Sequence, residues 1–344
     1  MYDRYPDRLP EAPPPRKRSP WSRILSSALL NSVRLLGGGL FLLTGAALVI
    51  PFLVFLVKAV DPDEQERIPY AERVGHAHGL AVDPAGNALY ITTTRGMYWI
   101  KSEDWAQRVG GDSYQDSQAL IAVGPGEFLA SGRPDIRDRV SGFAPPYSGL
   151  IRSQNAGAKW RTVSLAGEAN FRALDTDDRL VFGYDEVSGG FMVSSDAGKT
   201  WETRSRPPPL YDFAVDPGDI AFIYAITDES ASLVSRDGGR SWEPQSGPEL
   251  RFLVWQDPGV VWSAASTGEV YSSLDAGWTW QQRGSLTAPL EAFLVQDGVL
   301  YAAVYDDNTG IVIYESNDQA QTWTERYRDP PVNAGQEPAT EATP

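Results

Sequence analysis

The sequence predicts an all-β fold, a six-bladed β-propeller that follows one membrane-spanning α-helix. Three observations lead to this prediction: a motif that recurs about every 40 residues, short strand-like segments between its copies, and a long uncharged segment near the N-terminus. With 32 glycines, 26 prolines and 11 tryptophans among 344 residues, the composition is typical of an all-β chain with frequent turns.

The charge and the cysteine content exclude several classes of function. The net charge of −15 argues against a nucleic-acid partner, because phosphate binding needs a concentrated face of Lys and Arg. The absence of cysteine excludes thiol nucleophiles, disulfides and cysteine-ligated metal sites. The glycine clusters of the sequence lack the strand–loop–helix setting that phosphate or dinucleotide binding requires, so we expect no cofactor.

An uncharged segment near the N-terminus predicts a single-pass membrane anchor. Residues 35–57 form 23 consecutive positions without a charge, and a helix of this length measures ~34 Å, enough to cross a ~30 Å hydrocarbon core. A cleaved signal peptide is the alternative, but its apolar region is shorter and ends at a small-residue cleavage site. Positive charges dominate residues 1–34 and acidic ones follow the segment, so the N-terminus is expected in the cytoplasm. We therefore expect a disordered cytoplasmic tail (1–34), a transmembrane helix (35–57), an acidic linker (58–75) and an extracytoplasmic remainder.

A motif of the form Ser-x-Asp-x-Gly-x-x-Trp recurs through that remainder. Its five copies have tryptophans 41, 41, 38 and 43 residues apart, at Ser153–Trp160, Ser194–Trp201, Ser235–Trp242, Ser273–Trp280 and Ser316–Trp323. A degenerate copy ends at Trp105, and an insertion around residues 136–147 lengthens the next period. Each period contains four strand-like segments, which is typical of a four-stranded antiparallel blade. We expect six blades over residues 76–328, with a seventh involving residues 66–74 as the alternative, and a disordered tail over 329–344.

The residues of the motif suit a structural role. An Asp two positions after Ser can accept hydrogen bonds from the backbone of a turn, Gly supplies a positive φ, and Trp is expected to begin the fourth strand and pack beside the next blade. Ala320 replaces the Gly of the last copy, so that turn is expected to be the most strained. The structural set is Asn155, Trp160, Asp196, Trp201, Asp237, Trp242, Asp275, Trp280, Asp318 and Trp323.

These five copies resemble the BNR/Asp-box repeat, which is shared by sialidases, sortilin-type receptors, plant-type xyloglucanases and the photosystem II assembly propeller. The resemblance implies a propeller and says little about activity. The stretch HAHGLAVDP (His76 to Pro84) is similar to the start of a bacterial group of glycosyl-hydrolase-like Asp-box propellers. Arg133 and Arg172 stand where that group has histidines, which weakens any transfer of the group's site.

Aligning the first strand of each blade predicts a ring of polar residues at one mouth of the central channel. The aligned residues are His78, Gln118, Arg172, Asp212, Arg251 and Glu291. The arginines of this ring could bind a polar or anionic ligand through their forked N–H groups. The alternative is a ring of internal salt bridges that only closes the channel.

Two chemical alternatives involve the same ring. Glycoside hydrolysis needs two carboxyl groups on either side of the scissile bond, for which Asp212 and Glu291 are the candidates, with Tyr211 as a sialidase-like nucleophile. His76 and His78 lie on one face of a strand and are weak candidates for a metal site, because the chain contains no further histidine or cysteine.

The sequence therefore favours a membrane-anchored extracytoplasmic propeller that acts as a binding or assembly scaffold. We expect a protein partner in the envelope or membrane, or a polar ligand such as a glycan. An extracytoplasmic glycoside hydrolase is the alternative. The two interpretations differ in the geometry of Asp212 with Glu291, and in whether the insertion, which includes Phe143 and Tyr147, presents an apolar contact patch.

Overall fold

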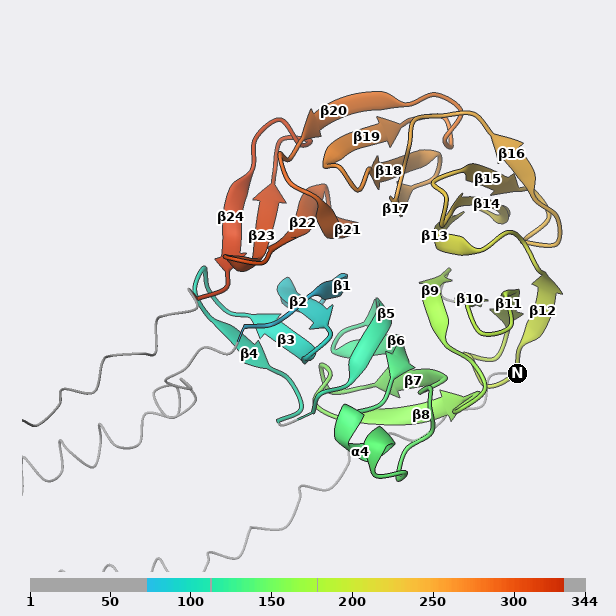
Figure 1. Ribbon diagram of the computed structural model, residues 1–344. Coiled ribbons are helices and arrows are strands. Elements are labelled where there is room, and N and C mark those ends of the chain that lie inside the picture. Colours follow the sequence, from blue (N-terminus) through green and yellow to red (C-terminus); the bar gives the residue numbers. More distant parts are fainter. Residues whose placement is uncertain (1–72, 112, 178, 331–344) are drawn as a thin grey trace, which may run out of the picture. The chain divides into compact units, whose positions relative to one another are not determined.

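The computed structural model describes residues 73–111, 113–177 and 179–330 (Figure 1). The predicted cytoplasmic tail, the predicted transmembrane helix (35–57) and nearly all of the predicted linker and C-terminal tail lie outside these residues. Within the described part, no helix is both long enough and apolar enough to cross a membrane. Val74 and Asp329, which the sequence assigned to the linker and the tail, are buried in the propeller.

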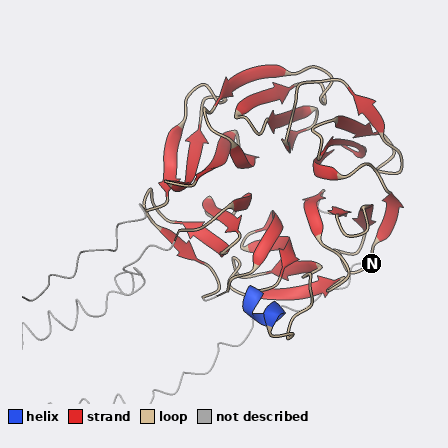
Figure 2. Cartoon of the chain, in the orientation of Figure 1, coloured by secondary structure: helices blue, strands red, loops and turns tan. Residues whose placement is uncertain are grey.

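Six four-stranded antiparallel sheets surround a central axis, and each is formed by four consecutive strands (Figures 1 and 2). The innermost strands are β1 (Ala77–Asp83), β5 (Asp116–Gly124), β9 (Phe171–Thr176), β13 (Leu210–Asp216), β17 (Phe252–Asp257) and β21 (Leu290–Gln296). The second strands are β2 (Ala88–Thr93), β6 (Glu127–Arg133), β10 (Val181–Asp185), β14 (Asp219–Thr227), β18 (Val260–Ala264) and β22 (Val299–Asp306). The third strands are β3 (Gly96–Ile100), β7 (Leu150–Ser153), β11 (Gly190–Ser194), β15 (Ser232–Ser235), β19 (Glu269–Ser273) and β23 (Gly310–Ser316). The outer strands are β4 (Ala106–Arg108), β8 (Trp160–Ser164), β12 (Glu202–Ser205), β16 (Glu243–Gln245), β20 (Gln281–Ser285) and β24 (Thr324–Arg328).

The described residues thus confirm the all-β class and the count of six blades, numbered 1 to 6 in chain order. Their buried apolar residues form six clusters, and each cluster lies between two neighbouring blades. One cluster joins blade 6 to blade 1 through residues such as Leu89 and Ile313. The core of this fold is therefore divided among the contacts between blades, which explains why strands buried on both faces have few polar positions.

The repeated motif forms the turn between the third and fourth strands. In blade 3, Ser194 Oγ donates to Asp196 Oδ1 (2.8 Å), and the Gly198 amide donates to Ser194 Oγ (2.8 Å). The Thr200 amide and hydroxyl both donate to the Asp196 carboxylate. The turn requires two successive positive φ values, +60° at Ala197 and +84° at Gly198. These bonds agree with the structural role expected from the sequence.

The tryptophans of the motif pack against the preceding blade, whereas the sequence analysis placed them beside the next one. Trp201 Nε1 donates to Ser164 Oγ of blade 2 (3.0 Å), and Trp242 Nε1 donates to Ser205 Oγ of blade 3 (3.0 Å). The Trp280 ring lies edge-on to Tyr224 of blade 4. The direction follows from the outer position of the fourth strand, which lies beside the outer strand of the preceding blade.

The antiparallel order gives the propeller two different faces. The face on which the first strands begin, here called the mouth face, also carries the connections between second and third strands. The opposite face, here called the box face, carries the turns that the repeated motif forms between third and fourth strands. The predicted insertion follows β6 on the mouth face and contains α4 (Ile136–Val140), the one short helix in Figure 2.

Candidate functional site

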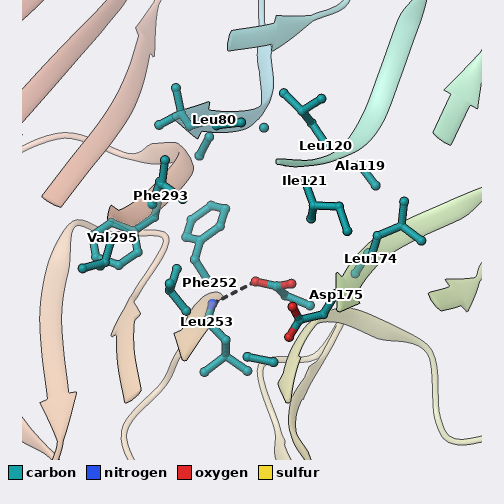
Figure 3. Close-up of a pocket in the computed structure, with 18 of the residues that line it drawn as sticks. Leu80, Ala119, Leu120, Ile121, Leu174, Asp175, Phe252, Leu253, Phe293 and Val295 are labelled. Atoms are coloured by element: carbon teal, nitrogen blue, oxygen red, sulfur yellow. Dashed lines mark hydrogen bonds between the residues drawn. The ribbon is translucent and has the colours of Figure 1, made fainter. Parts of the chain in front are cut away.

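The first strands surround an axial channel with a cavity of about 620 Å³. Apolar side chains from all six blades line it, and Figure 3 shows several of them, including Leu80, Leu120, Leu174 and Phe293. Carboxyl groups also line it, among them Asp175, which Figure 3 labels, and Asp212. The channel therefore presents polar groups beside its apolar side chains.

The ring at the mouth differs from the predicted one by one residue. In most blades the ring residue falls at a shift in register between the first and second strands, as at His78 and Glu291. In blade 4 the register shift falls at Tyr211, because Leu210 pairs with Thr227 and Asp212 with Ile226. The ring consists of His78, Gln118, Arg172, Tyr211, Arg251 and Glu291.

Asp212 thus occupies the next position of β13 and still lines the channel. The sequence contains a pattern that gives the correct alignment of this blade. The stretches HGLAVDP and YDFAVDP share AVDP, and matching these letters aligns Tyr211 with His78.

The two histidines near the mouth each lie beside a different carboxylate. Glu291 holds His76 Nδ1 at 2.6 Å from one carboxylate oxygen and accepts the Ala77 amide (2.7 Å) with the other. His78 Nε2 lies 3.0 Å from Asp116 Oδ1. The two histidines therefore have separate carboxylate partners, and no group of three or more metal-ligating side chains gathers within the described part of the chain.

On the opposite side of the ring, two arginines contact one tyrosine. The guanidinium carbon of Arg251 lies 3.1 Å from the centre of the Tyr211 ring, and that of Arg172 lies 4.6 Å from it. Arg172 also lies 3.6 Å from Glu186 and 3.5 Å from Asp228, which is longer than a charge-assisted hydrogen bond. Two positive charges therefore lie close together at this part of the mouth. The N–H groups of the Arg172 guanidinium form only long contacts with these two carboxylates.

The two channel carboxyls bind backbone amides of the next blade. Asp212 accepts the Leu253 amide (2.8 Å) and that of Phe213 (2.9 Å), and Figure 3 shows the first of these bonds. Asp175 accepts the Val215 amide in the same way (2.8 Å). Burial raises the pKa of Asp212 to about 7 and that of Asp175 to about 6. Sequence reasoning missed Asp175, although an acid in the inner strand FRALDT was the available signal.

A second cavity of about 380 Å³ lies beside Arg172 on the mouth face. Its walls include Tyr147 from the insertion, Tyr184 and Pro209, and the acids Glu186 and Asp228 close it. The insertion thus reaches the neighbourhood of the ring. This arrangement was not predicted, because it depends on how two blades meet.

The predicted catalytic candidates have structural partners. Both carboxylate oxygens of Asp212 accept backbone amides, and those of Glu291 bind His76 and Ala77. Among the described residues, no carboxylate forms a hydrogen bond to the Tyr211 hydroxyl, although a tyrosine nucleophile needs an adjacent base. The present contacts thus join blades more directly than they serve acid–base chemistry.

Comparison with known proteins supports the β-propeller fold of the described residues. No protein-family model matches the sequence, and no curated protein matches it. Among solved structures, the chain is similar to the Niastella koreensis GH74 enzyme, with 17% identity and a TM-score of 0.50 over 74% of this chain and 45% of that one. A chain of a nidogen/laminin complex has 11% identity and a TM-score of 0.50, and the match covers 70% of this chain and 97% of that one. YCF48 from Cyanidioschyzon merolae has 15% sequence identity and a TM-score of 0.44, and the match covers 74% of this chain and 85% of that one. The chain thus spans less than half of the GH74 enzyme, and at these identities the likeness concerns the β-propeller fold alone.

Proposed function

We propose that this protein is a membrane-anchored extracytoplasmic scaffold whose channel mouth binds an anionic group of an envelope or membrane protein. The observation that carries the proposal is the arrangement of Arg172 and Arg251 around Tyr211. The acids Glu291 and Asp212 are engaged in bonds between blades, whereas the ion pairs of Arg172 are long and its other contact is the face of the Tyr211 ring. An incoming carboxylate would find forked donors there, in a partly desolvated ring.

The anchor in this proposal rests on the sequence. Residues 35–57 carry no charge, and the positive residues before them favour a cytoplasmic N-terminus. The described chain begins on the mouth face, because Arg73 donates to the backbone oxygens of Asp307 and Asn308 in the turn between β22 and β23. An anchored propeller would therefore be tethered by the face that carries the ring.

A glycoside hydrolase is the second candidate, and one observation favours it. A carboxyl whose pKa is raised to about 7 is suited to act as a general acid, and burial does this for Asp212. Its carboxylate oxygens would have to exchange a backbone amide for a substrate oxygen, and this requirement makes the hydrolase the weaker candidate.

The test is purification of the tagged full-length protein from its native membranes in mild detergent, followed by identification of stoichiometric partners. We expect a recurrent partner with the wild type, and its loss in the double variant Arg172→Gln/Arg251→Gln. Arg179→Gln is the matched control, because Arg179 is 77% exposed in a turn on the box face and should leave the partner bound.

Two results would contradict the scaffold proposal: a wild-type protein that purifies alone, or a partner that remains with the double variant. In the first case the full-length protein is assayed against a panel of glycans. Hydrolysis that disappears in Asp212→Asn would then support the hydrolase, and hydrolysis that persists would exclude Asp212 as its acid.

A further inference from the structure

The described residues expose six large hydrophobic side chains, and they lie in two places. Leu274 and Trp278 lie in the blade 5 turn on the box face. The other four lie on the mouth face in blades 2 and 3: Ile136, Val140, Phe143 and Val187. Three of these belong to the insertion and are called the apolar tip: Ile136 (49% exposed), Val140 (81%) and Phe143 (88%). Side chains this exposed gain nothing from the core of the propeller.

The tip is held in a defined conformation. Asp135 caps α4 by accepting the Arg137 amide (2.9 Å), and its other oxygen accepts the Tyr114 amide (2.9 Å) at the start of blade 2. After the helix, the Phe143 and Ala144 amides both donate to the Asp138 carbonyl oxygen. The exposure of the apolar side chains is therefore built into the loop, and no residue of α4 is buried.

The side chains of the tip are exposed, and arginines accompany them. Arg137 and Arg139 lie on either side of Asp138 in α4, and Arg133 precedes the helix at the end of β6. Arg137 is paired with Asp135 (2.6 Å), which leaves Arg133 and Arg139 as the cations for an outside group. A protruding set of aliphatic and aromatic side chains needs a matching pocket on a protein partner, whereas the interfacial region of a bilayer accepts it without one. Arginines beside it can reach lipid phosphates, while the acidic character of the chain as a whole keeps other surfaces in water.

The chain outside the described residues leaves from the same face as the tip. Arg73 lies on the mouth face, and 15 residues (58–72) separate it from the end of the predicted membrane helix. Fully extended, such a segment spans about 54 Å at most, which is the upper limit of the distance between Arg73 and the end of that helix.

We propose that the apolar tip inserts into the headgroup region of the membrane that anchors the chain, and so turns the channel mouth toward the bilayer. The inference rests on the proposed membrane anchor. It deepens the proposed function, because a mouth that faces the bilayer selects partner segments lying next to the membrane.

The absence of cysteine allows a direct test with the full chain. A single cysteine is introduced as Phe143→Cys, labelled with a nitroxide, and the protein is reconstituted into liposomes. We expect the label to be several-fold more accessible to oxygen, which partitions into lipid, than to a water-soluble nickel chelate. Leu274→Cys is the matched control, because Leu274 is also a strongly exposed apolar residue (71%) but lies on the box face, and its label should favour the chelate.

Flotation of the same proteoliposomes after an alkaline wash reports the anchor separately. If the protein floats and the label at position 143 behaves like the control, the tip does not insert, although the anchor stands. If that label is shielded from both reagents, the tip contacts protein, and the inference is also wrong. A chain that does not float contradicts the anchor and the inference together.

Discussion

Asp212 and Asp175 show how single residues on the axis join one blade to the next. The inner strand of each blade has no further strand beside it, so its amides on the channel side need other acceptors. These two carboxyls supply them by accepting the Leu253 and Val215 amides. The same burial that makes the bonds effective disfavours the charged form, and this raises both pKa values.

This arrangement predicts a stability that decreases as the pH rises. Burial raises the pKa of Asp212 from 3.8 to about 7, so between these values the folded state binds more protons than the unfolded state. The free energy of unfolding is therefore highest when Asp212 is protonated and falls as the pH rises through about 7. The full shift corresponds to about 4 kcal/mol, and because the side chain is partly open to the channel we expect about 2 kcal/mol.

Denaturant unfolding of the full-length protein from about pH 5 to pH 8 measures this effect. In Asp212→Asn, the difference in unfolding free energy between the two pH values should shrink by about 1 kcal/mol, because this range covers only part of the window between 3.8 and about 7. Asp257→Asn removes an exposed carboxylate at the other end of the channel and should leave the difference unchanged. An equal pH dependence in all three proteins would mean that Asp212 is ionised in the fold at neutral pH.

Residue-scale reasoning from sequence located the ring, but it placed one member wrongly. The 40-residue periodicity was sufficient to find His78, Gln118, Arg172, Arg251 and Glu291. In blade 4 the prediction gave Asp212, whereas the residue at the register shift is Tyr211. The partners of the ring residues, such as Asp116 and Asp228, come from loops and strand ends whose positions no periodicity encodes.

At the scale of the element, the turn formed by the repeated motif is restricted by the blade that it touches. A Cβ at Gly277 would lie 2.4 Å from the Tyr224 ring, and one at Gly198 would lie 2.0 Å from Leu150. In blade 6 the same position is Ala320, with a φ of +67°. Its neighbour in blade 5 is Gly284, which leaves space for the extra methyl group. The last copy therefore departs from the motif where the preceding blade permits it.

This predicts opposite tolerances at two equivalent turns. Gly277→Ala forces a methyl group against Tyr224 at a φ of +84°, and should lower the free energy of unfolding by about 2–4 kcal/mol. Ala320→Gly relieves the backbone but removes a buried methyl group, so its net effect should lie within about 1 kcal/mol. Equilibrium unfolding of both variants is the measurement. Similar losses in the two proteins would show that the contact with the preceding blade does not control the turn.

At the scale of the whole molecule, the sequence was sufficient for the number and the order of the blades but not for their closure. Repeats at a constant spacing reveal identical units, because each unit must bury the same faces against its neighbours. The junction of the first and last blades occurs once and has no repeat to mark it. Val74 and Asp329 close it from segments that were assigned to a linker and a tail.

Closure depends on side chains, because blades 1 and 6 each take all four strands from one continuous segment. Asp329 is 2% exposed and accepts the amides of Val74 and Ile311 (both 3.1 Å) and the Tyr327 hydroxyl (2.8 Å). One carboxylate thus holds the entry of the chain, the third strand of blade 6 and its outer strand. Glu291 adds a second bond across this junction at the mouth, where it accepts the Ala77 amide.

We therefore expect Asp329→Ala to open the ring at this junction. The substitution leaves three buried donors without an acceptor, which should lower the free energy of unfolding by about 3 kcal/mol or more. Asp306→Ala, which removes an exposed turn carboxylate in the same blade, should cost much less, because water can replace it as the acceptor of the Asn308 and Thr309 amides. Hydrogen exchange distinguishes opening from general loss of stability, because only Asp329→Ala should accelerate exchange at Val74 and Ile311 beyond that in blades 3 and 4. Uniform acceleration around the whole ring would mean that the blades separate together and that this carboxylate has no special part in closure.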